Sequence, residues 1–262
     1  MRLLLLLAAM PIWAADDASA ILRRYLEADK QNDKKAEQYT FVQESAWFAR
    51  DKNGDMKQIR SETSEVIFVE GQTYRKLVAR NGSPLDAKEK AKVDKEMRET
   101  AEHLRKHPAW PDGGGVTNGH ARADFGSDEE LLTLFDNRVT GEEEIGGRKA
   151  WVIESTPRKD RTPATRHEKD IASFSKKLWI DEAENVELHA VYTVIEDHIY
   201  VKPGSTFTFE FQKINEDAWQ LAALVVETRN TTAGVIQAQG RMEMRFSNFK
   251  KFDVQSTVTI AK

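Results

Sequence analysis

The chain has 262 residues, of which 40% are hydrophobic and 31% charged, with a formal net charge of −4 and no cysteine. Lysine and arginine are dispersed among aspartate and glutamate and form no basic stripe with interleaved aromatics, which argues against a nucleic-acid-binding protein. Without cysteine the chain can form no disulfide and can carry no lipid on a cysteine side chain.

The first 15 residues have the pattern of a secretory signal peptide. Arg2 precedes an apolar run over residues 3–10, and small alanines follow before an acidic pair. A membrane-spanning helix needs about 20 apolar residues, so this run is too short to act as an anchor. We therefore expect an exported chain whose signal is cleaved, with residues 16–262 forming a single soluble domain.

The expected domain opens with an amphipathic helix at residues 19–33, where apolar side chains recur at helical spacing. The apolar period then changes from 3.6 to 2, which predicts a strand that ends at residue 50 and further strands at 59–69 and 73–80. The pair Asn53-Gly54 between the first two strands is typical of a β-hairpin.

A second helix, expected at residues 86–107, is densely charged. Its apolar residues form only a narrow line: Val93, Met97, Ala101 and Leu104. Such a stripe is typical of a helix that lies on a surface. The glycine-rich stretch at 108–127 predicts a flexible loop. Ser127 and Glu130 then form a capping box, which predicts a third helix that ends near residue 136.

The rest of the chain alternates like β-sheet. Strands are expected at residues 137–145, 149–156, 176–181, 186–196, 205–214, 218–229, 235–249 and 254–260. Short turns join most of them, so the sheet should be antiparallel and meandering.

Two motifs have the spacing of catalytic or metal sites but lack the residues that such sites need. His103 and His107 are four apart on a helix, yet Leu104 stands where a zinc-peptidase motif requires glutamate. Ser173 and Lys176 have the spacing of some acyl-enzyme hydrolases, yet the supporting motifs are missing. We therefore expect no enzyme activity, no catalytic residue, no metal site and no cofactor, with a hydrolase that uses Ser173 as a remaining alternative.

Large apolar residues alternate along the expected strands, so one face of the sheet should be strongly apolar. An ordinary packed core explains this pattern as well as a binding site does. A curved sheet of about ten strands, however, encloses more volume than its side chains readily fill, which favours a ligand-binding hollow. The residues expected to line this hydrophobic cavity are Phe41, Trp47, Trp151, Ile153, Leu178, Ile180, Phe207, Phe209 and Phe211.

Three segments, at residues 134–143, 147–157 and 177–181, follow one another in a recognisable order. A strand that ends in proline is succeeded by a strand containing Trp-Ile-Asp, and the later turn at 203–205 and strand at 246–249 fit the same pattern. In these features the chain resembles the LolA-like family of outer-membrane lipoprotein-sorting proteins over most of its length.

The resemblance implies a mainly β (α+β) fold: an unclosed antiparallel β-barrel of about 10–11 strands with a few helices as lid or plug. It also implies a periplasmic carrier that holds the acyl chains of lipids or acylated lipoproteins in a hydrophobic cavity. The alternative is an envelope sensor or protein-interaction module, with envelope membrane proteins as possible partners.

The transfer of about 16 methylenes out of water is worth on the order of 12 kcal/mol. A carrier therefore needs an enclosed apolar cavity and a lid that opens. The charged helix at 86–107 is the expected lid.

Overall fold

The computed structural model describes residues 15–70, 72–106, 128–196, 201–232 and 236–252. The expected signal peptide, apart from its last residue, lies outside these ranges. So do the glycine-rich loop expected at 108–127 and the last strand expected at 254–260.

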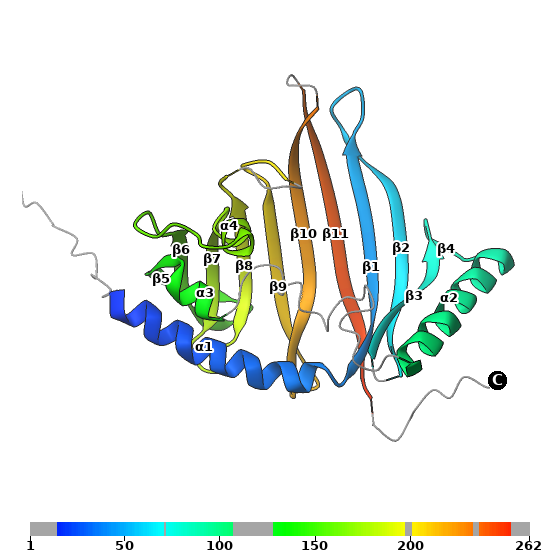
Figure 1. Cartoon of the computed structure of the whole chain (residues 1–262), viewed down its shortest axis with the longest axis horizontal. Helices are drawn as coiled ribbons and strands as arrows, with labels where there is room; N and C mark the ends of the chain where they lie inside the picture. The colour runs from blue at the N-terminus through cyan, green and yellow to red at the C-terminus, as the bar shows by residue number, and fades with distance from the viewer. Residues whose placement is uncertain (1–14, 71, 107–127, 197–200, 233–235, 253–262) are drawn as a thin grey trace, which may run out of the picture.

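All strands in the described part of the chain belong to one antiparallel sheet of eleven strands (Figure 1). Their bounds are β1 Tyr39–Arg50, β2 Met56–Val69, β3 Gln72–Arg80, β4 Ser83–Pro84, β5 Phe135–Ile145, β6 Arg148–Pro157, β7 Phe174–Asp181, β8 Glu187–Val194, β9 Thr206–Ile214, β10 Ala218–Thr232 and β11 Ile236–Lys251. The spatial order is β4-β3-β2-β1-β11-β10-β9-β8-β7-β6-β5, so every neighbour is consecutive in the chain except β1 and β11. Since β4 and β5 are free edges, the sheet is not closed, and the expected fold class is confirmed.

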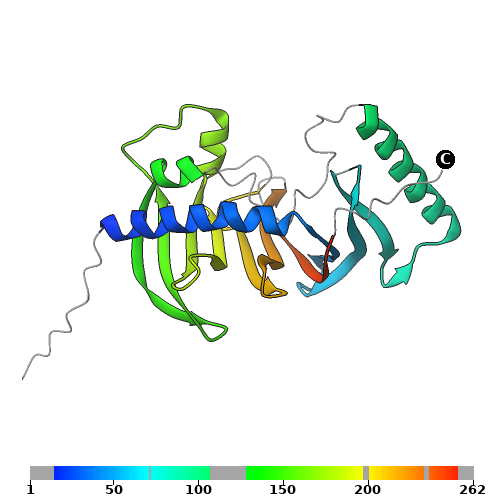
Figure 2. The same cartoon turned by 90° about the horizontal axis from the view of Figure 1, so that it is seen from below.

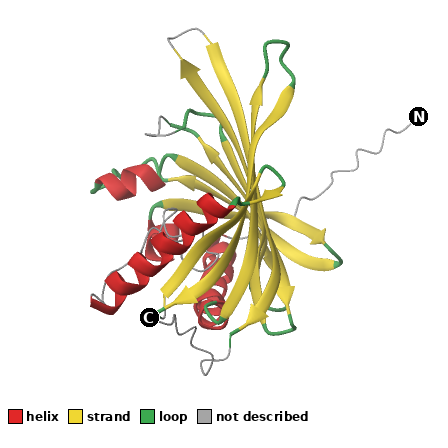
Figure 3. Ribbon diagram, turned by 90° about the vertical axis from the view of Figure 1, so that its right-hand side faces the viewer, coloured by secondary structure: helices red, strands yellow, loops and turns green. Residues whose placement is uncertain are grey.

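The described residues contain four helices: α1 Ala15–Ala36, α2 Ala87–Lys106, α3 Asp128–Thr133 and α4 Arg166–Ile171. Helix α1 crosses one end of the strands and contacts β5, β10 and α3, as seen from below in Figure 2. Helix α2 packs beside β3 near the opposite edge of the sheet. The strands fan out strongly, as the twist of a wide antiparallel sheet requires (Figure 3).

Two of the tight turns follow directly from their sequences. Asn81-Gly82 joins β3 to β4 and Gly146-Gly147 joins β5 to β6, and all four residues have positive φ between 50° and 80°. A two-residue turn with positive φ at both positions matches the right-handed twist of the strands that it joins. Glycine or asparagine at these positions therefore sets the register of both hairpins.

Two expectations about helices need correction. The third helix, expected up to residue 136, ends at Thr133, because Phe135 pairs with Pro157 and starts β5. Pairing with β6 overrides the local helical pattern there. Helix α4 was not expected, although Thr165 caps it by accepting a hydrogen bond from the backbone of Glu168 at 3.0 Å. This Thr-x-x-Glu capping box was present in the sequence.

Candidate functional site

One face of the sheet, called the inner face below, is where α1 packs. Residues paired across antiparallel strands point to the same face, so the register identifies a continuous row of inner-face side chains over ten strands. From β5 to β3 the row is Val139, Ile153, Leu178, Ala190, Phe209, Leu224, Met244, Ser45, Glu62 and Arg80. The row is apolar from β5 to β11 and becomes polar at β1.

A second row runs parallel to the first, nearer to the hairpin between β1 and β2. Its members are Asn137, Ser155, Lys176, Tyr192, Phe207, Val226, Met242, Trp47 and Arg60. Lys176 is only 5% exposed, and its ammonium lies 4.6 Å from the ring centroid of Phe135 and 5.1 Å from that of Tyr192. Aromatic faces therefore accommodate this buried charge.

The apolar half of the inner face, over β5 to β11, is the main core of the domain. Ile153 and Ile180 are completely buried there, and Leu178 is 1% exposed. Helix α1 contributes a stripe to the same core: Ala18, Ile21, Leu22, Tyr25 and Leu26. Because these residues recur at i, i+3, i+4, i+7 and i+8, α1 presents a broad apolar face to the sheet.

The structure brings together all but one of the residues expected to line a cavity. Five are buried in the core: Phe41, Ile153, Leu178, Ile180 and Phe209. Three others, Trp151, Phe207 and Phe211, are half-buried and pack against it. Trp47 lies on the inner face but outside this core, with the Arg60 guanidinium 4.8 Å from its ring centroid. Binding of a ligand by these residues stays a prediction.

The helix expected to act as a lid is α2, and in the structure it lies away from the apolar half. It buries Ala101 and Leu104, and ion pairs join it to neighbouring strands, among them Lys76–Asp94 at 3.1 Å. Within the described residues, α1 and α3 cover the apolar half instead. The broad stripe of α1, compared with the narrow line of α2, was the sequence signal for this difference. A lid function of α2 stays a prediction.

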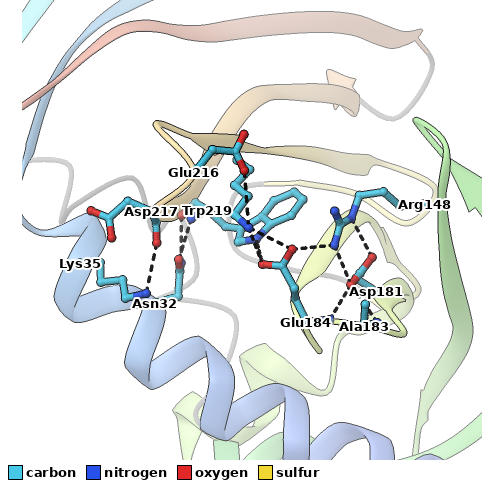
Figure 4. Close-up of polar contacts among 10 residues, drawn as sticks. Asn32, Lys35, Arg148, Asp181, Ala183, Glu184, Glu216, Asp217 and Trp219 are labelled. Atoms are coloured by element: carbon cyan, nitrogen blue, oxygen red, sulfur yellow. Dashed lines mark hydrogen bonds and ion pairs between the residues drawn. The ribbon is translucent and has the colours of Figure 1, made fainter.

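Polar contacts fix the C-terminal end of α1 to the turn between β9 and β10 (Figure 4). The Asn32 side chain brackets the backbone of Trp219, because its Nδ2 donates to the carbonyl at 2.9 Å and its Oδ1 accepts from the amide at 2.6 Å. Lys35 Nζ donates to the Asp217 carbonyl at 3.2 Å. Outside the figure, Gln220 Nε2 donates to the Ala36 carbonyl at 2.9 Å. The C-terminal end of α1 is therefore anchored by polar contacts, whereas its apolar stripe mainly packs, with a further hydrogen bond from Tyr25 Oη to Glu187 Oε2 at 3.4 Å.

The same figure shows a charged network beside this anchor. Arg148 donates to both carboxylate oxygens of Asp181, at 2.8 and 3.0 Å, and to Glu184 at 2.8 Å. Glu184 also accepts from Trp219 Nε1 at 3.1 Å and pairs with Lys213 at 3.0 Å. Burial alone would raise the pKa of Glu184, but these hydrogen bonds lower it below its ordinary value. Since the charges compensate one another, we interpret the network as structural.

Three polar side chains are buried on the inner face where the rows become polar. Gln43 is 1% exposed, Ser45 5% and Ser64 6%. Gln43 Nε2 donates to Ser45 Oγ at 3.0 Å, but Gln43 Oε1 has no hydrogen-bond partner among the described residues. A buried acceptor without a partner is costly and marks a position that serves something other than stability. The alternation of apolar and polar residues around Gln43 is that of any strand, so it could not predict this buried acceptor.

The described residues offer no group of three or more histidine, aspartate or glutamate side chains that could hold a metal ion. Ser173, the only lead for a hydrolase, donates its hydroxyl to the Asp170 carbonyl at 2.6 Å, where it closes the turn after α4. None of the helices in these ranges has the length and apolar character needed to cross a membrane.

The sequence matches no family model, and no curated protein is significantly similar to it. Among solved structures, the chain is similar to a domain from Vibrio parahaemolyticus assigned to outer-membrane lipoprotein sorting, with 12% identity, a TM-score of 0.42, and coverage of 90% of this chain and 93% of that one. The resemblance to LolA-like proteins thus recurs among solved structures.

Two further structures are similar over comparable lengths. A DUF1329 family protein from Desulfovibrio piger has 17% identity and a TM-score of 0.38, over 92% of this chain and 95% of that one. A LolA superfamily protein from Nitrosomonas europaea has 10% identity and a TM-score of 0.37, over 90% and 94%. Likeness at this level assigns no function.

Proposed function

We propose that the chain is a periplasmic carrier that holds the acyl chain of a lipid, or of an acylated protein, against the apolar half of the inner face. The proposal rests on a single observation: an uninterrupted apolar row over seven strands, from Val139 to Met244. The export signal expected in residues 1–15 supports the compartment.

Part of this apolar surface remains accessible. Large side chains border the buried core and are only half-buried, namely Leu132, Trp151, Phe207, Phe211, Met242, Met244 and Phe249. A contiguous apolar surface of this kind is typical of a binding site. An ordinary core would bury such side chains more completely, because full burial of each is worth about 1.5–3 kcal/mol.

The polar end of the rows favours an amphipathic ligand over a plain hydrocarbon. Ser45 and Glu62 continue the row directly from Met244, and the unpartnered Oε1 of Gln43 lies beside them. An acyl chain along β5–β11 would place its polar head next to these groups. Each hydrogen bond made there would replace one that the head group loses on leaving water.

Binding of a fluorescent C16 fatty acid to single variants tests the proposal. Phe207→Gln changes a half-buried inner-face residue, and Thr208→Gln changes its neighbour on the same strand, which faces the other way. We expect the first to weaken binding about tenfold or more, since roughly 1.5–3 kcal/mol of apolar contact is removed. The second should bind like the wild type.

Melting curves show whether both variants fold, and Met242→Gln on β11 provides a second inner-face probe. The proposal is wrong if the folded wild-type protein does not bind the fatty acid. It is also wrong if Thr208→Gln weakens binding as much as the inner-face changes do. Capture of a stoichiometric protein partner by a lipid-free chain would favour the interaction module.

A further inference from the structure

A separate hollow of about 300 Å³ is lined by the end of β1, the starts of β2 and β9, and residues within β10 and β11. In Figure 1 this end of β1 and β2 lies opposite the end of the sheet that α1 crosses. Thr206, Glu227 and Arg241 line the hollow and are paired across β9, β10 and β11. They alternate with the inner-face residues Phe207, Val226 and Met242, so they face away from the apolar half. The charged part of the lining therefore faces away from the apolar half, whereas Thr228 and Gly240, which are paired with each other, share the parity of Val226 and Met242.

The lining of the hollow is cationic in a chain whose net charge is negative. It contains Arg50, Arg229 and Arg241 against one carboxylate, that of Glu227. Arg241 pairs with Glu227 at 2.9 Å and with Glu243, outside the lining, at 2.7 Å. Arg50 donates to the Gly54 carbonyl. Their charges are thus partly compensated.

Arg229 differs from the other two arginines. Within the described ranges its guanidinium has no hydrogen-bond or ion-pair partner, while its backbone is fixed by a 2.8 Å bond from its amide to Ser205 Oγ. Arg229 Nη1 lies 2.8 Å and Cζ 3.1 Å from where a Cβ at Gly204 would stand. Gly204 has a φ of +84°, a backbone conformation that favours glycine. A side chain there would also displace the Arg229 guanidinium. The guanidinium therefore lies across the Gly204 backbone, and no described residue accepts a hydrogen bond from it.

Gly240 keeps the opposite wall open in a similar way. A Cβ at Gly240 would lie 2.9 Å from Thr228 Oγ1, so a larger residue would push this hydroxyl aside. Thr228 and Thr206 both line the hollow. The Thr228 hydroxyl donates to the Gly240 carbonyl at 3.3 Å, so it can only accept from a ligand. The Thr206 hydroxyl and the Arg229 guanidinium can donate hydrogen bonds to oxygens of one tetrahedral anion.

We propose that this hollow binds a phosphate group. The planar fork of Arg229 matches two phosphate oxygens, which a lysine in its place would not do. A volume of about 300 Å³ accommodates a phosphorylated head group or a small phosphate ester but no long acyl chain. This inference does not require that the inner face carries a lipid.

The surroundings of the hollow bear on the source of the phosphate. Within the described residues, the large hydrophobic side chains that are most exposed are Met56 at 38%, Ile59 at 66% and Ile195 at 43%. Met56 lines the hollow, and Ile59 follows it on β2. Ile195 directly follows Val194, whose carbonyl accepts from Gly204 at 2.8 Å. A cationic hollow with exposed apolar side chains on the segments that adjoin it suits the phosphate of a phospholipid at a membrane surface, whereas a soluble phosphate ester would use the hollow alone.

The experiment measures calorimetric binding of inorganic phosphate and flotation with vesicles of phosphatidylglycerol or phosphatidylcholine. Arg229→Gln should weaken both phosphate and phosphatidylglycerol binding at least about fivefold, the worth of one basic residue near an anionic surface. Arg138→Gln is the matched control, because Arg138 is an exposed arginine on β5 with no partner in the described chain. It should change neither.

Ile59→Ser separates the two sources. If the phosphate belongs to a membrane lipid, Ile59→Ser loses vesicle binding but keeps inorganic phosphate binding. If the phosphate belongs to a soluble ester, the wild-type protein binds inorganic phosphate but does not bind vesicles. The inference is overturned if the wild-type protein binds neither probe, or if Arg229→Gln and Arg138→Gln behave alike. None of these results depends on fatty acid binding, so the carrier proposal fails or stands separately.

Discussion

The buried Gln43 allows a direct test of whether an inner-face residue serves ligand binding or the stability of the fold. The Gln43 side chain is only 1% exposed, and its Oε1 has no partner within the part of the chain that the structure describes, which costs about 1–3 kcal/mol relative to a satisfied acceptor. Gln43→Met has almost the same shape and places its sulfur near Met244, whose Sδ already lies 3.6 Å from Gln43 Nε2. The change removes the unsatisfied oxygen together with two hydrogen bonds from Nε2, one to Ser45 Oγ worth about 0.5–1.5 kcal/mol and a weaker one to Met244 Sδ.

The net result should be a ligand-free protein that is more stable by about 1 kcal/mol. For a domain of this size, we expect calorimetry to show a melting temperature about 2–4 °C higher. Gln220→Met is the matched control, since Gln220 is equally buried but its Nε2 donates to the Ala36 carbonyl at 2.9 Å. That variant should lose about 1–3 kcal/mol by leaving the carbonyl unpaired.

The same Gln43→Met variant should lose part of its binding to a monoacylglycerol, whose hydroxyls can donate to Gln43 Oε1, and keep its binding to a fatty acid methyl ester. The loss should be about tenfold for one buried hydrogen bond. If Gln43→Met is destabilised as much as Gln220→Met, Gln43 serves the fold and our reasoning about a polar subsite is refuted.

Three further predictions concern the anchor of α1 and the outer face. Arg148→Met should lower the free energy of unfolding in urea by about 3–5 kcal/mol, because it leaves the buried Asp181 carboxylate without its arginine. Arg158→Met, which breaks an exposed ion pair, should lower it by less than about 1 kcal/mol. Equal losses in the two variants would contradict the account. Burial lowers the pKa of His189 despite nearby carboxylates. The unfolded chain therefore takes up the proton at a higher pH than the folded chain does, and the free energy of unfolding should fall as the pH drops below about 6.5. His189→Phe should make this fall smaller, and an unchanged pH profile would refute the assignment. Asn32→Ala should speed amide exchange in α1 about tenfold or more while exchange in α2 stays unchanged, since two part-buried hydrogen bonds of about 1 kcal/mol each are lost. Equal acceleration in both helices would indicate general destabilisation.

Much of the sheet follows from local sequence signals. Alternation along Phe207, Phe209 and Phe211 predicts their shared face, and the pair Gly146-Gly147 predicts the hairpin between β5 and β6. These signals act within a few residues, so they survive without knowledge of the rest of the chain. The end of α3 shows their limit, because pairing of Phe135 with a strand 22 residues later decides it.

Features that depend on distant residues could not be predicted from the sequence. The pairing of β1 with β11 joins residues about 200 positions apart, and it is this pairing that brings Ser45 beside Met244. The phosphate hollow likewise depends on the approach of Arg229 to Gly204 and Arg50. Each residue is unremarkable in its own strand, and only the register of the sheet assembles them.

The identity of the helix that covers the apolar half was within reach of the sequence. Charge drew attention to the helix at 86–107, whereas the width of the apolar stripe in α1 was the better guide. A stripe that spans i, i+3, i+4 and i+7 buries more area than a line at i and i+4. The helix that covers a core is therefore predicted by the width of its apolar stripe, not by the charge of its exposed side.

Mass spectrometry of the native protein, purified from the periplasm without detergent, tests the carrier account most directly. The account predicts a bound molecule with at least one acyl chain, present in the wild-type protein and the Thr208→Gln control and largely absent after Phe207→Gln. A folded protein that is consistently free of lipid, with identical spectra for the wild type and Phe207→Gln, would contradict it.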